Sequence, residues 1–191
     1  VCAETGEVDG TFLWFDTAER RATFYISDPV IDIKYVFFHL KNYAFDWNTV
    51  DDLQGTAIGA TVGYDLGEAF QEAEQDNVIT VERVTTDEQN FQKLLLGRVQ
   101  IFPCDVEVGY ALIRKLFPPA QAELFTHHTK PLKAAPHHLL LSKKNERNKK
   151  MMELFNKGLR QLKDSGKYEQ YLVEMRTDIG FSVSEYSTDF K

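Results

Sequence analysis

Short apolar segments of strand character alternate along this chain with segments whose apolar residues recur at helical spacing. The strand-like segments are residues 12–15, 24–26, 35–40, 57–61, 78–84, 99–103 and 137–141. The helix-like segments are residues 68–74, 145–162 and 167–174, with two more that begin near residues 87 and 105. This alternation favours an α/β architecture with mainly parallel sheets.

Three polar sites directly follow predicted strands: Asp16–Arg20, Gly63–Asp65 and Asp105. Ligands of open α/β sheets bind beyond the carboxyl ends of the strands, so these sites are candidates for binding. Arg20 lies in a short charged turn, residues 18–21, and an arginine can hold a carboxylate through two parallel hydrogen bonds. The alternative is a surface arginine that only solvates the turn.

The composition excludes several classes of protein. A formal net charge of −7 and a pI near 5.3 argue against nucleic-acid binding, which requires a basic excess. Lysines and arginines gather in residues 141–167, where helical spacing predicts the solvated face of an amphipathic helix. No apolar run reaches the roughly 18 residues of a transmembrane helix.

Nothing in the sequence indicates a metal or a cofactor. Cys2 and Cys104 are too few for a cysteine-based zinc site, and two unpaired thiols are expected rather than a bridge. The histidines of the pairs at 127–128 and 137–138 should diverge in a strand, which favours surface or core roles over metal binding. A nucleophile–base pair and a phosphate-binding glycine loop are also absent from the sequence.

Six motifs in order resemble the amino-acid type of solute-binding protein that serves ABC importers (bacterial extracellular solute-binding protein family 3). Thr17-Ala18-Glu19-Arg20 is similar to the T-x-x-R motif of that family. The other matching segments are residues 6–10, 24–29, 53–59, 94–99 and 142–145 with 155–159. The resemblance extends from Glu4 to about Met175.

This resemblance implies the type II periplasmic-binding fold, in which two α/β lobes enclose the ligand. Residues 1–36 and 136–191 would form the first lobe, and residues 37–135 the second. The first lobe is expected to be incomplete, because the opening third of a typical member has no counterpart before Val1. Self-association of such a truncated chain is possible, since an incomplete lobe exposes apolar surface.

The resemblance also implies site residues. Arg20 matches the arginine that binds the ligand α-carboxylate, and Asp105 matches the aspartate that receives the α-ammonium. A zwitterion enclosed away from water needs an opposite charge at each end. Tyr64 and Asp65 replace two threonines, and Asp65 either selects a cationic ligand side chain or caps its helix.

Aromatic residues before Arg20 also depart from the family pattern. Phe15 replaces a small hydroxyl residue, and Trp14 beside it is a candidate wall of the ligand pocket. Phe12 is expected to pack in the core, because alternate residues of a strand point to opposite faces.

The expected function is therefore that of a non-enzymatic binding component of an ABC transporter, without cofactor, capturing an amino acid or related carboxylate by hinge closure. Its partners would be the ligand and a membrane permease, with no nucleic acid. Its location would be periplasmic, or extracellular and membrane-tethered, with a signal peptide in the precursor. The alternatives are a dehydratase-like enzyme with Asp65 or Asp105 as the acid, and the sensory input domain of a receptor.

Overall fold

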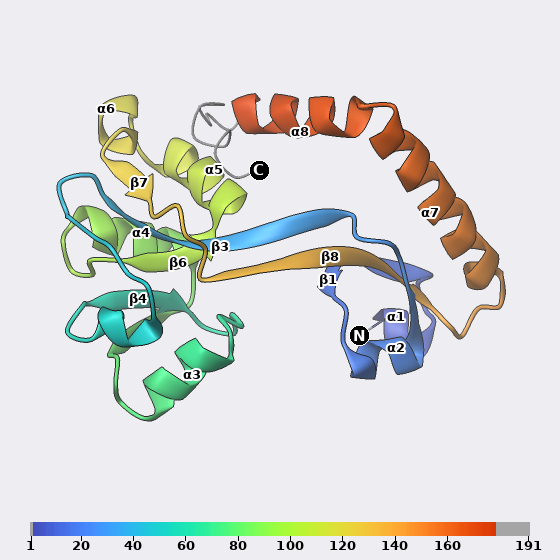
Figure 1. Cartoon of the computed structure of the whole chain (residues 1–191), viewed down its shortest axis with the longest axis horizontal. Helices are drawn as coiled ribbons and strands as arrows, with labels where there is room; N and C mark the ends of the chain where they lie inside the picture. The colour runs from blue at the N-terminus through green and yellow to red at the C-terminus, as the bar shows by residue number, and fades with distance from the viewer. Residues whose placement is uncertain (1, 179–191) are drawn as a thin grey trace. The chain divides into compact units, whose positions relative to one another are not determined.

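The computed structural model describes residues 2–178. The chain divides into two compact units. The first unit comprises Val1–Ile33 and Ala135–Met175, and the second comprises Lys34–Ala134 and Arg176–Lys191. The chain passes between the units within two long strands, β3 (Ile31–Leu40) and β8 (Lys133–Ser142), and within the last helix, α8 (Lys167–Asp178) (Figure 1).

The first unit is built on β8 from Ala135 onward. Its other elements are α1 (Cys2–Thr5), β1 (Gly10–Phe15), α2 (Ala18–Thr23), β2 (Phe24–Ile26) and α7 (Arg147–Asp164). Both β1 and β2 pair antiparallel with β8, and α7 packs against β2. The core cluster of this unit is small, with Ala3, Phe24 and Leu140 buried and Ile26 packed against them.

The second unit contains two groups of strands. Its elements are η1 (Val50–Leu53), β4 (Ile58–Thr61), α3 (Glu68–Gln75), β5 (Val81–Val84), α4 (Asp87–Leu95), β6 (Phe102–Asp105), α5 (Val106–Leu116), α6 (Pro119–Ala122) and β7 (Phe125–His127). β6 and β7 pair antiparallel with β3, whereas β4 and β5 are parallel. Helix α4 packs against β4, β5 and β6.

Most of the buried apolar side chains belong to this second unit. One cluster centres on Phe38, Phe91 and Phe102 and contains α4 and α5 residues. The other centres on Phe37, with Trp47 and Phe70 packed near it. These two clusters give β4, β6 and the turns that follow them a rigid support.

The α/β class is confirmed, but the prediction of mainly parallel sheets is wrong. Four of the strand pairings are antiparallel, and the parallel contacts are the β4–β5 ladder and the bridge between Ile58 and Ile101. Parallel pairing needs a crossover such as α3 between β4 and β5. Strands β3 and β8, which carry the chain between the units, pair with antiparallel partners.

Two local predictions also need correction. The charged turn at 18–21 is the start of helix α2, because the Thr17 hydroxyl accepts the Arg20 N–H at 3.2 Å and caps the helix. Phe12 is 47% exposed rather than buried. Its aromatic partner within residues 2–178 is Phe155 of α7, at 6.4 Å between ring centroids, and one edge contact does not cover the ring.

The C-terminal helix extends further than its apolar pattern predicts. The apolar spacing predicts a helix over residues 167–174, and α8 continues to Asp178. Residues 179–191 lie outside the described residues.

Candidate functional site

Arg20 of the first unit is fixed by its own strand and helix. The Thr17 cap starts α2 and places Arg20 on the N3 position of that helix. The Arg20 Nη1 donates to the carbonyl oxygen of Phe15 at 2.8 Å, and its guanidinium carbon lies 4.8 Å from the ring centroid of Trp14. A cation above an indole face is attracted to it, so these contacts orient the guanidinium. No carboxylate between residues 2 and 178 forms an ion pair with Arg20.

The neighbouring Arg21 has a different environment. Arg21 Nε donates to Asp16 Oδ1 at 2.7 Å, and Arg21 Nη2 pairs with Asp16 Oδ2. This hydrogen-bonded pair lowers the pKa of Asp16 and raises that of Arg21. Asp16, the acidic residue that directly follows β1, is therefore already paired with an arginine other than Arg20.

The aromatic residues before Arg20 are partly exposed. Trp14 is 39% exposed, and its indole Nε1 donates to the Thr11 hydroxyl at 2.8 Å. The Phe15 ring lies 4.2 Å from the ring of His137, centroid to centroid. A β-bulge at Leu13, whose φ is +62°, separates Phe12 from Trp14 in the register with β8. The bulge breaks simple alternation in β1 and turns Trp14 beside Arg20.

Asp105 of the second unit ends β6 and caps helix α5. Its Oδ1 accepts the Val108 N–H at 2.8 Å, and the residue is only 8% exposed. Burial raises the pKa of Asp105 to about 6, helped by the nearby charges of Glu107 and Asp87, while its backbone hydrogen bonds oppose the shift. Between residues 2 and 178, no cation forms an ion pair with Asp105.

Tyr64 is held by a carboxylate that the sequence did not single out. The Tyr64 hydroxyl donates to Asp87 Oδ2 at 2.8 Å, and the Thr61 hydroxyl donates to Asp87 Oδ1 at 2.5 Å. The Tyr64 ring meets Tyr35 edge to face at 5.9 Å, and Tyr35 is paired with Asp105 in the β3–β6 register. Burial, followed by the charge of Asp105, raises the pKa of Tyr35 to about 12. Tyr64, Tyr35 and Asp105 thus form one contiguous face of the second unit.

The Asp65 carboxylate also has hydrogen-bond partners within the second unit. Its Oδ1 accepts the Gly67 N–H at 3.0 Å, and its Oδ2 accepts the Lys133 ammonium at 2.6 Å. The hydrogen bond from Lys133 lowers the pKa of Asp65. Gly67, not Asp65, is the N-cap of α3, so Asp65 stabilises the turn that leads into the helix. Lys133 was missed by sequence reasoning, because nothing in the motif around it indicates a partner 68 residues away.

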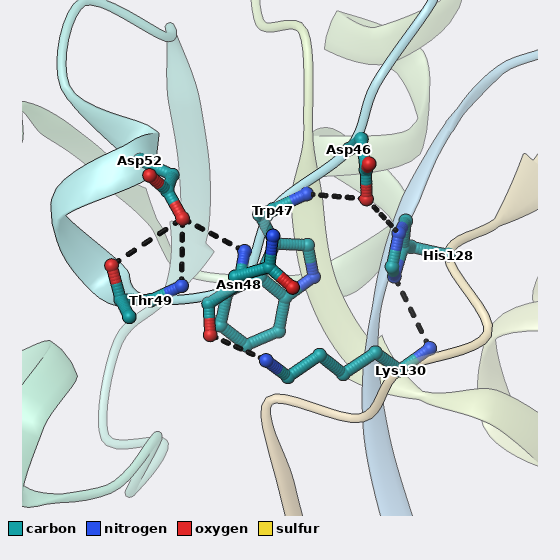
Figure 2. A network of polar contacts seen from close by, with 7 residues as sticks. All are labelled: Asp46, Trp47, Asn48, Thr49, Asp52, His128 and Lys130. Atoms are coloured by element: carbon teal, nitrogen blue, oxygen red, sulfur yellow. Dashed lines mark hydrogen bonds and ion pairs between the residues drawn. The ribbon is translucent and has the colours of Figure 1, made fainter.

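The paired histidines have structural partners. Figure 2 shows His128 bonded through Nε2 to Asp46 Oδ1 at 3.1 Å, while its Nδ1 accepts the Lys130 N–H. The ammonium of Lys130 lies over the Trp47 ring, which ties the loop before η1 to the segment after β7. His138 bonds the Ser27 carbonyl at 2.7 Å. In the described part of the chain, no group of three or more metal-ligating side chains comes together.

Both cysteines are free thiols, as expected: Cys2 is exposed and Cys104 is buried in the second unit. Burial raises the pKa of the Cys104 thiol well above its usual value, with a further contribution from the charge of Asp87. A buried, protonated thiol is a poor nucleophile, so Cys104 acts as a packing residue.

No protein-family profile matches the chain, and no curated protein matches it either. Solved structures do. A mutant of ArgBP from T. maritima superposes with a TM-score of 0.65 at 22% identity, over 92% of this chain and 72% of that chain. The second substrate binding domain of a putative amino acid ABC transporter from Streptococcus pneumoniae gives a TM-score of 0.68 at 18% identity, over 91% and 75%.

The chain has a periplasmic-binding-protein-like fold. A histidine kinase sensor domain with similarity to periplasmic binding proteins shares this fold, with a TM-score of 0.68 at 14% identity over 91% of this chain and 72% of that chain. Identities this low establish the periplasmic-binding-protein-like fold and no more. Within residues 2–178, no helix combines the length and the apolar character needed to cross a membrane.

Proposed function

We propose that this protein binds an amino acid or a related small carboxylate, as the solute-binding component of an ABC transporter. The support from comparison is the periplasmic-binding-protein-like fold, which it shares with a domain named as the substrate binding domain of an amino acid ABC transporter. On this proposal the binding units are the two lobes, residues 1–36 with 136–191 and residues 37–135, and hinge closure encloses the ligand. The partner is a membrane permease, and the location is periplasmic or extracellular.

The observation that carries the proposal is a pair of opposite charges without ion-pair partners. Arg20 and Asp105 both lack one among residues 2–178, whereas Arg21 pairs with Asp16 and Lys133 with Asp65. A charge held in place without a counter-charge is costly when it is desolvated, and a ligand of opposite charge removes that cost. The α-carboxylate of an amino acid fits Arg20, and its α-ammonium fits Asp105.

A second candidate function, the sensory input domain of a receptor, is favoured by the likeness to the histidine kinase sensor domain. A sensor domain would bind the same kind of ligand as a transport protein. The two functions differ only in whether lobe closure signals to a receptor or presents the ligand to a permease. The two domains compared above at a TM-score of 0.68 are named as a substrate binding domain and a sensor domain, which supports the two binding functions.

Isothermal titration calorimetry with a panel of amino acids tests the proposal. We expect at least one to bind in the micromolar range, and Arg20→Ala to weaken that binding by about 2 kcal/mol or more, close to thirtyfold. The matched control is Arg21→Ala, because the Arg21 guanidinium already pairs with Asp16. Equal losses for the two variants, or no loss for Arg20→Ala, would remove Arg20 from the site.

A further inference from the structure

A hollow of about 400 Å³ opens on the second unit beside Tyr64. The turn after β4, helix α3 and strand β5 supply its walls. Its uncharged polar lining comes from Tyr64, Gln71 and Gln75, and its charged lining comes from Asp65, Glu74 and Arg83. The hollow therefore adjoins the face that carries Tyr35 and Asp105, through the edge-to-face contact between the two tyrosines.

The charged residues of this hollow are all neutralised within the second unit. Arg83 binds Glu74 with two hydrogen bonds, Nε to Oε1 at 2.8 Å and Nη2 to Oε2 at 2.6 Å. Its Nη1 donates to the Thr61 carbonyl at 3.1 Å. Lys133, the first residue of β8, holds Asp65 at 2.6 Å. With Lys133 included, the hollow carries no net charge.

Lys133 is the residue on which this neutrality depends. The Asp65 Oδ1 is occupied by the Gly67 N–H and, more weakly, by the Gln71 amide at 3.4 Å, and its Oδ2 is occupied by Lys133. The Asp65 side chain is 59% exposed, so a cationic ligand group that approached this carboxylate would have to share it with the Lys133 ammonium and would be repelled by it. The Lys133 side chain is 21% exposed, so it is held against the protein rather than free in solvent.

We propose that Lys133 is a specificity-determining residue: by occupying Asp65 it gives the hollow a neutral, polar character, and the site prefers amino acids with uncharged polar side chains over cationic ones. This inference rests on the proposed function. Of the two roles considered for Asp65, it argues against selection of a cation, because the carboxylate already has an ion-pair partner in Lys133. The Lys133–Asp65 ion pair instead disfavours a positively charged ligand side chain.

The test compares arginine with citrulline, which has nearly the same shape without the charge. Calorimetry on the full chain gives the ratio of their association constants for the wild type, Lys133→Met, Asp65→Asn and the double variant. Lys133→Met leaves Asp65 unpaired, and we expect it to raise the arginine-to-citrulline ratio by about fivefold or more. Asp65→Asn removes the carboxylate and keeps the charge of Lys133, so it should lower the ratio, and the double variant should return it to the wild-type value.

Two controls isolate the charge at this site. Lys115→Met on α5 removes the same charge from an exposed position and should leave the ratio unchanged. Lys133→Gln repeats the result with a polar side chain if the methionine variant folds poorly. A wild type that prefers arginine, or an unchanged ratio in both Lys133 variants while binding persists, overturns the role of Lys133 alone. Absence of binding by the wild type to every amino acid tested overturns the proposed function, and this inference with it.

Discussion

Asp105→Asn should stabilise the ligand-free protein at neutral pH while it weakens ligand binding. The carboxyl group of Asp105 is buried without a cation partner among the described residues, and its pKa is raised to about 6. An asparagine in this position keeps the cap of α5, because its side-chain oxygen can still accept the Val108 N–H. The substitution therefore removes the buried charge and leaves the local structure in place.

The magnitude follows from the pKa of Asp105 in the two states. It is about 6 in the folded protein, against an ordinary value of 3.8 when unfolded. Below about pH 4 both states hold the proton, and Asp105 contributes nothing to the pH dependence. Between about pH 4 and pH 6 the folded state holds more protons than the unfolded state, so the free energy of unfolding falls as pH rises. At about 1.4 kcal/mol for each pH unit, the loss above pH 6 reaches about 3 kcal/mol.

Urea unfolding of the wild type and of Asp105→Asn, at about pH 4 and about pH 8, measures this effect. We expect Asp105→Asn to gain up to about 3 kcal/mol relative to the wild type on going from the lower to the higher pH. Calorimetry at the higher pH should show weaker amino-acid binding, because the α-ammonium loses its counter-charge. A difference in unfolding free energy that stays constant with pH would refute the argument that Asp105 is a destabilised, unpaired carboxylate.

Three further substitutions have expected outcomes. Gly109→Ala would place its methyl carbon 2.3 Å from Cζ of the fully buried Phe38, so urea unfolding should show a loss of about 1–3 kcal/mol. Asn148→Ala removes buried hydrogen bonds from its amide to the carbonyls of Asp9 and Ser142, at 3.0 and 2.9 Å, and should cost about 1–3 kcal/mol in the same assay. Trp14→Leu removes the ring beneath the Arg20 guanidinium, and calorimetry should show amino-acid binding weakened by about 0.5–1 kcal/mol.

Local signals in the sequence predicted most of the helices and strands. The order of strand, glycine turn and helix located β4 and α3, and the apolar spacing located α7. The buried face of α7 contains Met152 and Leu159, and a helical period alone leaves the phase of such a face uncertain by one residue. The direction of strand pairing was not predictable, since it depends on partners that are distant in sequence.

The candidate site shows the same division between local and distant information. The spacing of Thr17 and Arg20 has a local cause, since a cap residue bonds the N–H three positions later, and this spacing is visible in the sequence. The partners of Tyr64 and Asp65 are Asp87 and Lys133, which lie 23 and 68 residues further along the chain. No periodicity or motif connects residues at those separations.

Asp65 and Asp105 look equivalent in the sequence, since each follows a strand and precedes a helix. Their surroundings shift the two pKa values in opposite directions. Lys133 lowers the pKa of Asp65, while burial raises that of Asp105. A carboxylate that already has a cation gains little from a ligand ammonium, whereas a buried carboxylate without one gains the most. On this physical criterion Asp105 is the stronger candidate for the residue that binds the ligand ammonium. Asp65 affects the choice of ligand side chain only through its ion pair with Lys133, which cancels its charge.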